Sequence, residues 1–116
     1  MVVYQSPGVE LTDEDVDRIF RALADATRRD ILRRSLAGPL SVTELAGSYA
    51  MSFAAVQKHV AVLEGAGLVT KEPNGRERLV NGSPEAIARA QELMDSYEAI
   101  WQSRVDRLDA LLGETD

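Results

Sequence analysis

The 116-residue sequence contains no cysteine and a single histidine, His59. The missing thiols exclude disulfides, cysteine nucleophiles and thiolate-bound metals, and one histidine cannot form a histidine-based metal cluster within one subunit. No apolar run approaches the roughly 18 residues that a membrane span requires. The N-terminal sequence MVVYQSPGVELTDED lacks the basic start and the apolar stretch of a secretory signal. We therefore expect a cytoplasmic protein that neither enters the membrane nor binds a metal cofactor.

Charge is distributed unevenly along a chain of ordinary globular composition. Hydrophobic residues make up 45% and charged residues 28%, which together with the length indicates one domain. The net charge is −6, yet residues 18–80 hold ten bases against six acids. The acids are concentrated in 1–17 and 81–116. A basic middle between acidic ends favours a polyanionic partner for the middle segment.

Apolar spacing and turn residues divide the chain into short helices, a hairpin and one long helix. Residues 1–11 show no periodicity and are predicted to form a loose arm before a single domain over 12–116. The order predicts a mainly α protein with a small β-hairpin (α+β), a winged helix-turn-helix with long N- and C-terminal dimerisation helices. The predicted elements are helices over 12–24, 26–37, 41–49, 52–65 and 83–112, with the helix-turn-helix over 41–66 and the wing over 68–81.

Local cap and turn residues set the boundaries of the helix-turn-helix and the wing. Ser41 and Glu44 have the spacing of a capping box, in which each side chain binds the other residue's amide. Ser52 is a cap for the next helix, and the short break between the two helices is typical of a helix-turn-helix. Asn74-Gly75 is a strong signal for a tight hairpin turn.

The helix that begins at Ser52 is the predicted DNA-reading element. Val56, Val60 and Leu63 share one face at helical spacing, so the opposite face carries small residues with Gln57 and Lys58. Small residues allow close approach to a major groove, where Gln pairs with adenine edges and Lys with guanine edges or phosphate. First-turn amides at Ser52 suit a phosphate oxygen. A plain solvated face is the alternative interpretation.

Two residues on the flanks of that helix leave both interpretations open. Phe53 either borders the core or touches a thymine methyl, and His59 is either a partly buried packing residue or contacts a phosphate.

Arg76 and Arg78, which are two positions apart, are predicted to lie on one face of a wing strand, where they enter a minor groove or clamp phosphates. A solvated edge hairpin is the alternative. The predicted DNA contacts are Ser52, Phe53, Ala54, Ala55, Gln57, Lys58, His59, Arg76 and Arg78.

The last helix has more apolar surface than one small domain needs. Its apolar residues step by three or four along some 28 positions, or about 42 Å, so the surplus seam is predicted to meet a second subunit. Packing within the chain is the alternative, expected at the end near Ile87, and Tyr97 and Trp101 could instead line a ligand pocket. The predicted dimer residues are Val16, Ile19, Phe20, Leu23, Met94, Tyr97, Trp101, Val105, Leu108 and Leu112.

Two stretches resemble the ArsR family of bacterial winged-helix transcriptional regulators. Residues 23–32, LADATRRDIL, are similar to the family pattern LADPTRRxIL. The segment SFAAVQKHV with the later GAGLV is similar to its recognition helix and exit, and the resemblance covers about residues 15–82. It implies a homodimer that binds a palindromic double-stranded DNA operator and usually represses transcription.

The sequence departs from that family pattern at the metal-sensing positions. The founding metal sensors carry C-V-C-D-L where this chain has SVTEL, so Ser41 and Thr43 replace both thiolates. Hydroxyls are poor ligands for soft metals. Ala26 also replaces the usual proline. The resemblance therefore implies a member without metal sensing, without a cofactor, and with an unknown small-molecule inducer, if any.

Two other functional classes compete with a DNA-binding regulator. A winged-helix module for protein–protein contact is the alternative, which the basic middle disfavours. An enzyme is excluded because the sequence shows no nucleophile–base pair, no phosphate-binding loop and no metal cluster.

Overall fold

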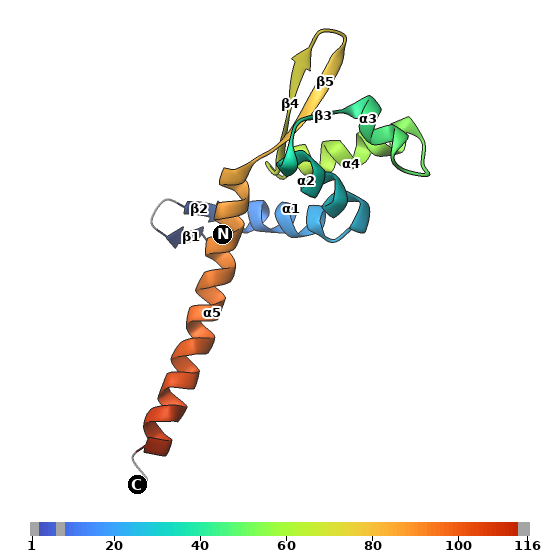
Figure 1. Cartoon of the computed structure of the whole chain (residues 1–116). Coiled ribbons are helices and arrows are strands. Elements are labelled where there is room, and N and C mark those ends of the chain that lie inside the picture. Colours follow the sequence, from blue (N-terminus) through green and yellow to red (C-terminus); the bar gives the residue numbers. More distant parts are fainter. Residues whose placement is uncertain (1–2, 7–8, 114–116) are drawn as a thin grey trace.

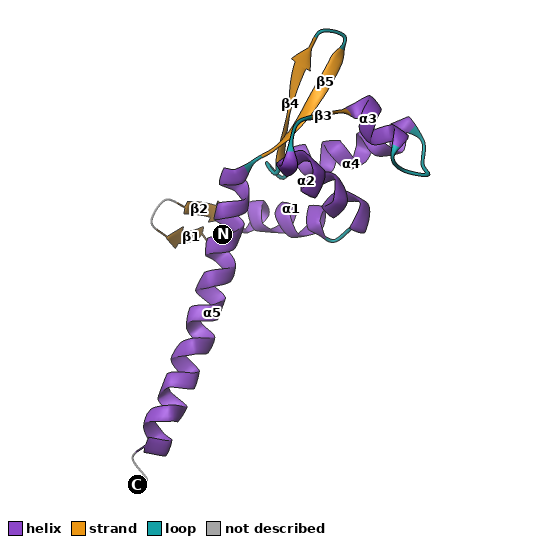
Figure 2. Ribbon diagram, in the orientation of Figure 1, coloured by secondary structure: helices purple, strands orange, loops and turns teal. Residues whose placement is uncertain are grey.

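The structure is a computed structural model that describes residues 3–6 and 9–113. Four helices and a small sheet form the body, and one long helix projects from it (Figures 1 and 2). The prediction of a mainly α protein with a small β component is confirmed. The elements are β1 Val3–Ser6, β2 Val9–Thr12, α1 Asp13–Leu23, α2 Ala26–Ala37, β3 Leu40–Ser41, α3 Val42–Gly47, α4 Phe53–Gly65, β4 Val69–Asn74, β5 Glu77–Gly82 and α5 Pro84–Gly113.

The predicted helix starts are confirmed by side chains that bind the free amides of the first turn. The Ser41 hydroxyl accepts from the Glu44 amide at 3.0 Å, and the Glu44 carboxylate accepts from the Ser41 amide, which is a capping box. Thr12 and Asp15 form a second one at the start of α1. Ser52 Oγ accepts from the Ala55 amide at 3.1 Å. The starts of both helices of the helix-turn-helix are therefore fixed by side chains within three residues of each cap.

One apolar core holds α1 to α4 and the sheet in place. Fully buried side chains come from every layer, including Ile31 of α2, Leu45 of α3 and Leu63 of α4. The first turns of α5 cover the same core through Ala86 and Leu93. Beyond them α5 leaves the body, and the described chain extends over 70 Å along its longest axis (Figure 1).

The N-terminal residues differ from the prediction of a loose arm over 1–11. In the described part of this segment β1 and β2 pair antiparallel, with Val3 opposite Thr12 and Ser6 opposite Val9. Leu11 joins the core with 4% of its surface exposed. The prediction was wrong here because strands of four residues are too short for an alternation of apolar and polar residues to be recognised in the sequence.

The base of the wing contains a third strand that the sequence pattern missed. β3 is only two residues long, and it pairs with β5 through Leu40 opposite Val80 and Ser41 opposite Leu79. The strand order is β3-β5-β4. Because Ser41 is also the cap of α3, this short ladder connects the wing directly to the helix-turn-helix.

The wing turn lies one residue later than predicted. β4 continues to Asn74 and β5 begins at Glu77, so Gly75 and Arg76 form a two-residue turn. Gly75 has φ +64°, and no described non-glycine residue has a positive φ. A two-residue turn in which only the first central residue has a positive φ requires glycine at that position. Arg76 therefore lies at the tip, and the prediction that it shares a strand face with Arg78 is wrong.

Close packing between α2 and β5 gives the first testable prediction. A Cβ on Gly82 would lie 2.6 Å from Leu36 Cδ2 and 3.0 Å from the Leu36 backbone nitrogen. Gly82→Ala should therefore lower the free energy of unfolding by about 1–3 kcal/mol, measured as a lower urea midpoint. Gly47→Ala is the matched control, since nothing lies within 4 Å of its Cβ position. Equal midpoints for the two variants would contradict this account of the packing.

Candidate nucleic-acid interface

The outer face of α4, defined as Ala54, Gln57, Lys58 and Ala61, is exposed to solvent. Val56, Val60 and Leu63 anchor the opposite side of the helix, with at most 1% of their surface exposed. The amphipathic division expected from the sequence is therefore present. Because two of these four side chains are alanines, little protrudes from this face, and a DNA duplex could approach the helix backbone closely.

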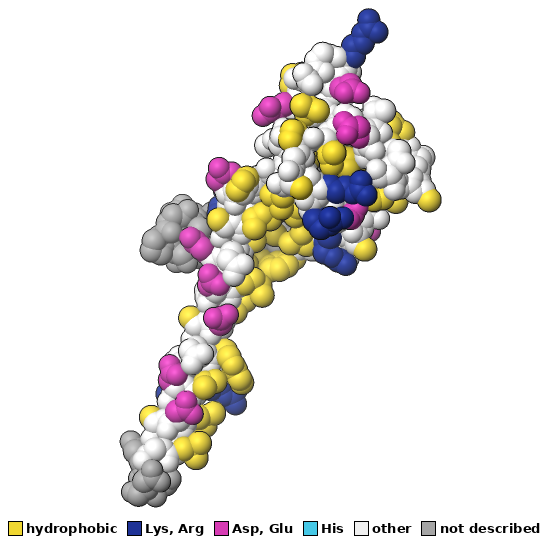
Figure 3. All heavy atoms as spheres, viewed as in Figure 1, with side chains coloured by type: hydrophobic (Ala, Val, Ile, Leu, Met, Phe, Trp, Pro, Cys, Tyr) yellow, Lys and Arg dark blue, Asp and Glu magenta, His cyan; other side chains and the backbone are white. Residues whose placement is uncertain are grey.

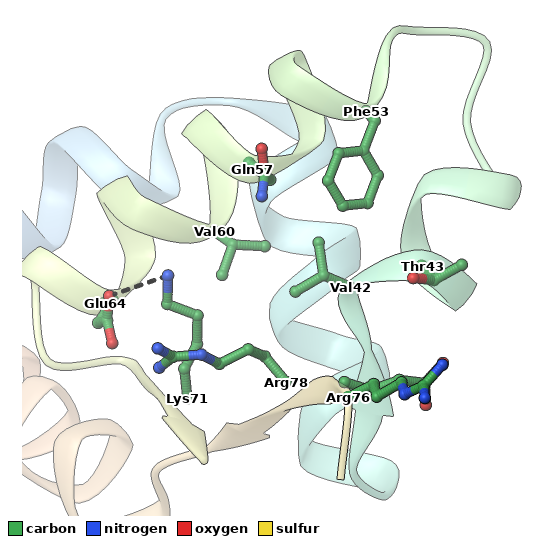
Figure 4. Close-up of a pocket in the computed structure, with 10 residues that line it drawn as sticks. Val42, Thr43, Phe53, Gln57, Val60, Glu64, Lys71, Arg76 and Arg78 are labelled. Atoms are coloured by element: carbon green, nitrogen blue, oxygen red, sulfur yellow. Dashed lines mark ion pairs between the residues drawn. The ribbon is translucent and has the colours of Figure 1, made fainter. Parts of the chain in front are cut away.

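The start of α4 adds a polar and an aromatic group beside this face. Ser52 is exposed, and its hydroxyl caps the first turn. Phe53 has 47% of its surface exposed, and its ring is directed into the space between α4 and α3 (Figure 4). Ala55 is half-buried. Phe53 is therefore not part of the core and faces a groove.

A groove of about 500 Å³ lies between α3, α4 and the wing. Gln57 lies on its α4 side, while Arg78 reaches into it from β5 (Figure 4). The sequence did not predict this groove, because its walls come from segments up to 36 positions apart. It is lined by Val42, Thr43, Phe53, Gln57, Val60, Glu64, Lys71, Arg76, Glu77 and Arg78.

One ion pair connects the wing to the reading helix. Lys71 Nζ of β4 lies 3.5 Å from Glu64 Oε1 near the end of α4 (Figure 4). The pair is partly exposed, so it contributes little to stability and mainly relates the two elements in space. It also offsets the charge of Lys71, so Arg76 and Arg78 are the exposed bases that the wing offers to a polyanion.

His59 lies on the α2 side of α4, apart from the outer face. Its Nδ1 is 3.3 Å from Arg28 Nη1 and 4.0 Å from Asp25 Oδ1. A guanidinium can only donate, so this contact is a hydrogen bond when Nδ1 is the ring nitrogen that carries no proton. Arg28 also donates to the carbonyls of Ala22 and Arg21 at the end of α1. Of the two interpretations of His59, its position favours packing.

The predicted dimer residues fall into two groups. Val16 and Ile19 have 8% and 4% of their surface exposed and belong to the chain's own core, so their assignment to an interface was wrong. Amphipathic spacing on α1 cannot distinguish a core from an interface. Leu23 is half-buried against the core, whereas Phe20 of the same helix is exposed.

The distal part of α5 presents an exposed apolar stripe. Yellow side chains follow one side of this helix in Figure 3. Trp101 has 60% of its surface exposed and Leu108 has 52%, while Val105 is half-buried. A contiguous exposed apolar surface of this kind marks an interaction site. The exposed members are Met94, Tyr97, Ile100, Trp101, Leu108, Leu111 and Leu112.

Neither a membrane-spanning helix nor a metal-binding cluster is found among the described residues. No helix there combines the length and the apolarity needed to cross a bilayer. No three His, Cys, Asp or Glu side chains of that part of the chain come together as a potential metal site.

Comparison with known proteins relates the fold and the sequence to transcriptional regulators. No protein-family model matches the chain. The HTH-type transcriptional regulator Rv2034 of Mycobacterium tuberculosis is 38% identical over 97 residues, which cover 84% of this chain and 82% of the relative. The crystal structure of the ArsR family transcriptional regulator RHA00566 superposes with a TM-score of 0.75 at 32% identity, covering 80% of this chain and 96% of that one.

A third comparison extends the likeness of fold. The solution structure of the homodimeric winged helix-turn-helix DNA-binding domain of Mb0332 from Mycobacterium bovis gives a TM-score of 0.61 at 23% identity. The match covers 78% of this chain and 90% of that one. At this identity the likeness concerns the arrangement of helices and wing.

Proposed function

Because the chain belongs to the ArsR family of transcriptional regulators, we propose that it is a cytoplasmic homodimeric repressor that binds a palindromic operator and does not respond to metals. The observation that carries the proposal is the position of the wing beside the outer face of α4. Gln57 of α4 and Arg78 of the wing line the same groove, so one duplex can touch both elements.

The two elements suit different parts of a duplex. The outer face of α4 fits a major groove, where Gln57 can pair with an adenine edge and Lys58 with a guanine edge or a phosphate. Phe53, Ala54 and Ala55 supply apolar contact at the helix start. Arg76 at the wing tip suits an adjacent minor groove, and Arg78 suits a phosphate. Ser52 and the first-turn amides of α4 suit a phosphate as well. His59, held by Arg28, plays a supporting role beneath the helix.

A second copy of the chain completes the proposed site. The exposed stripe of α5 together with Phe20 forms the proposed dimer surface, with Leu23 at its border. Two subunits related by a twofold axis would read half-sites roughly 34 Å apart. With six to ten phosphate contacts per dimer, operator affinity should fall about 10³–10⁵-fold between 50 and 200 mM salt.

The chemistry at the family's α3 metal position does not fit a soft metal. Ser41 has 1% of its surface exposed, and its hydroxyl is engaged with the Glu44 amide in the cap of α3. The nearby Thr43 offers another neutral hydroxyl. Such oxygens are poor ligands for arsenic(III) or cadmium, which prefer thiolates. No thiolate is available anywhere in the sequence.

This chemistry gives the second prediction, which concerns metal ions. Adding zinc or arsenite to the protein–operator complex should leave the operator affinity unchanged, since no thiolate can bind arsenite at α3 and the described residues bring no three zinc-ligating side chains together. The measurement is fluorescence anisotropy of labelled operator with and without each metal. A chelator added afterwards controls for precipitation. Metal-dependent release that the chelator reverses would refute the absence of metal sensing.

A gel-shift experiment tests the function itself. The DNA upstream of the protein's own gene is compared with random duplex of equal length, first at low salt and then at physiological salt. A DNA-binding regulator should shift both at low salt and prefer the upstream DNA at higher salt. A winged-helix module for protein contact, the alternative function, should shift neither, and that result would overturn the proposal.

A further inference from the structure

A polar cluster outside the proposed DNA-contacting residues connects α2 with the end of α3. Asp30 Oδ2 of α2 accepts hydrogen bonds from the Tyr49 hydroxyl at 2.5 Å and from Arg34 Nε at 3.0 Å. Arg34 Nη1 donates to Ser48 Oγ at 3.0 Å, and its guanidinium carbon lies 5.4 Å from the centre of the Tyr49 ring. Ser48 Oγ in turn donates to the Glu44 carbonyl of α3 at 3.1 Å. Asp30 and Arg34 of α2 thus hold the two residues that directly follow α3.

The cluster lies at the start of the turn that joins α3 to α4. Ser48 is the C-cap of α3, and Ser52, the N-cap of α4, follows four residues later. A six-residue helix such as α3 is too short to persist without tertiary support. Leu45 of α3 and Val56 of α4 are both buried in the common core, and apolar packing has no preferred direction. The hydrogen bonds of the cluster are directional.

Electrostatics keep the cluster in one protonation state over the working pH range. The hydrogen bonds from Tyr49 and Arg33 lower the pKa of Asp30 to about 2. Burial and the hydrogen bond to Asp30 raise the pKa of Tyr49 to about 12. The carboxylate is therefore charged and the phenol neutral wherever the protein functions, so the short hydrogen bond between them persists.

We propose that Asp30, Arg34 and Tyr49 are positioning residues that fix the α3–α4 turn on α2 and thereby set the orientation of α4 for operator recognition. The inference rests on the proposed function. Specific recognition requires base contacts in register, whereas binding of random duplex depends mainly on charge. A loosened turn should therefore reduce the preference for operator more than the affinity for DNA in general.

The chain offers a matched control within the same cluster. Arg33 forms an ion pair with the other carboxylate oxygen of Asp30, and its side chain is 71% exposed. Unlike Arg34, whose guanidinium bonds Ser48 Oγ and lies over the Tyr49 ring, Arg33 is hydrogen-bonded to Asp30. Arg33→Ala therefore removes a partner of Asp30 without releasing the turn.

The first measurement is hydrogen exchange on the intact protein without DNA. Tyr49→Phe removes one oxygen and keeps the ring beside Arg34. It should accelerate exchange of the Ala55 and Val56 amides, which bind Ser52, by roughly tenfold, because a hydrogen bond to a charged group is lost. Amides of the β4–β5 ladder should exchange as in the wild type. Arg33→Ala should leave all of these rates unchanged.

The second measurement is the ratio of operator affinity to random-duplex affinity. Tyr49→Phe should lower this ratio by roughly tenfold, while the random-duplex affinity changes by less than about twofold. A wild-type ratio in Tyr49→Phe, or an equal loss in Arg33→Ala, would overturn the proposal. A wild-type protein that prefers no duplex would instead overturn the proposed DNA-binding function, and the exchange rates would still decide whether the cluster anchors the turn.

Discussion

Replacing Lys58 by glutamate is expected to abolish operator binding while the protein remains a folded dimer. Lys58 is exposed on the outer face of α4, and no acid shares that face with it. The substitution turns an attraction to phosphate or guanine into a repulsion, and it does so twice in a dimer. We expect operator affinity to fall by roughly 100-fold or more at physiological salt. Fluorescence anisotropy with labelled operator measures the change.

Two companion variants make this result interpretable. Lys58→Gln removes the charge without reversing it and should give an intermediate loss. Arg21→Glu causes the same change in net charge on α1, away from the outer face of α4, and should retain most of the affinity. If Lys58→Glu binds operator as the wild type does, α4 does not meet DNA through the face assigned to it. An equal loss in Arg21→Glu would mean that only net charge matters.

The second large effect is expected at the stripe of α5. Trp101 has 60% of its surface exposed, so its contacts within one chain are few, and Arg104 lies 5.9 Å from its ring. Trp101→Glu should barely change the folding of a single subunit. It should raise the dimer dissociation constant about 100-fold, because a large aromatic side chain at an interface centre often dominates binding. Sedimentation equilibrium measures the dissociation constant.

Ser103→Glu is the matched control for this substitution. It introduces the same charge two positions away on the same helix, outside the apolar stripe. The control should remain a dimer and bind operator normally, whereas Trp101→Glu should lose both properties together. A dimeric Trp101→Glu variant would show that another surface joins the subunits. A monomeric Ser103→Glu variant would show that α5 tolerates no added charge at all.

The parts of the fold that the sequence predicts well are those with local causes. Ser41 with Glu44 and Ser52 are cap residues whose partners lie three positions away, so the helix starts could be located without any tertiary information. The core side of α4 follows from the 3.6-residue period, and Val56 and Val60 are buried as expected.

The parts that the sequence predicts poorly depend on distant partners. β3 is only two residues long, and it forms because Leu40 pairs with Val80, forty positions later in the chain. The role of His59 depends on Arg28 of another helix, and that of Val16 on a core to which all five helices contribute. Arg76 was misplaced by a single residue, because Asn-Gly fixes the presence of a tight turn more firmly than its register.

The groove between α4 and the wing illustrates the same limit. Its ion pair joins Glu64 to Lys71, and neither residue stands out in the sequence. The positioning cluster likewise joins Asp30 to Tyr49 across 19 positions, and each residue is unremarkable in its own segment. Such contacts become apparent only when the elements are placed in space.

The central claim is that two copies of this chain bind one symmetric stretch of duplex. The most direct test is the mass of the complex with a duplex that carries a single inverted repeat from upstream of the gene, measured by native mass spectrometry. The account predicts two chains on each duplex, with no stable complex of one chain at equal concentrations. One chain per duplex, or equal binding to a scrambled repeat, would contradict it.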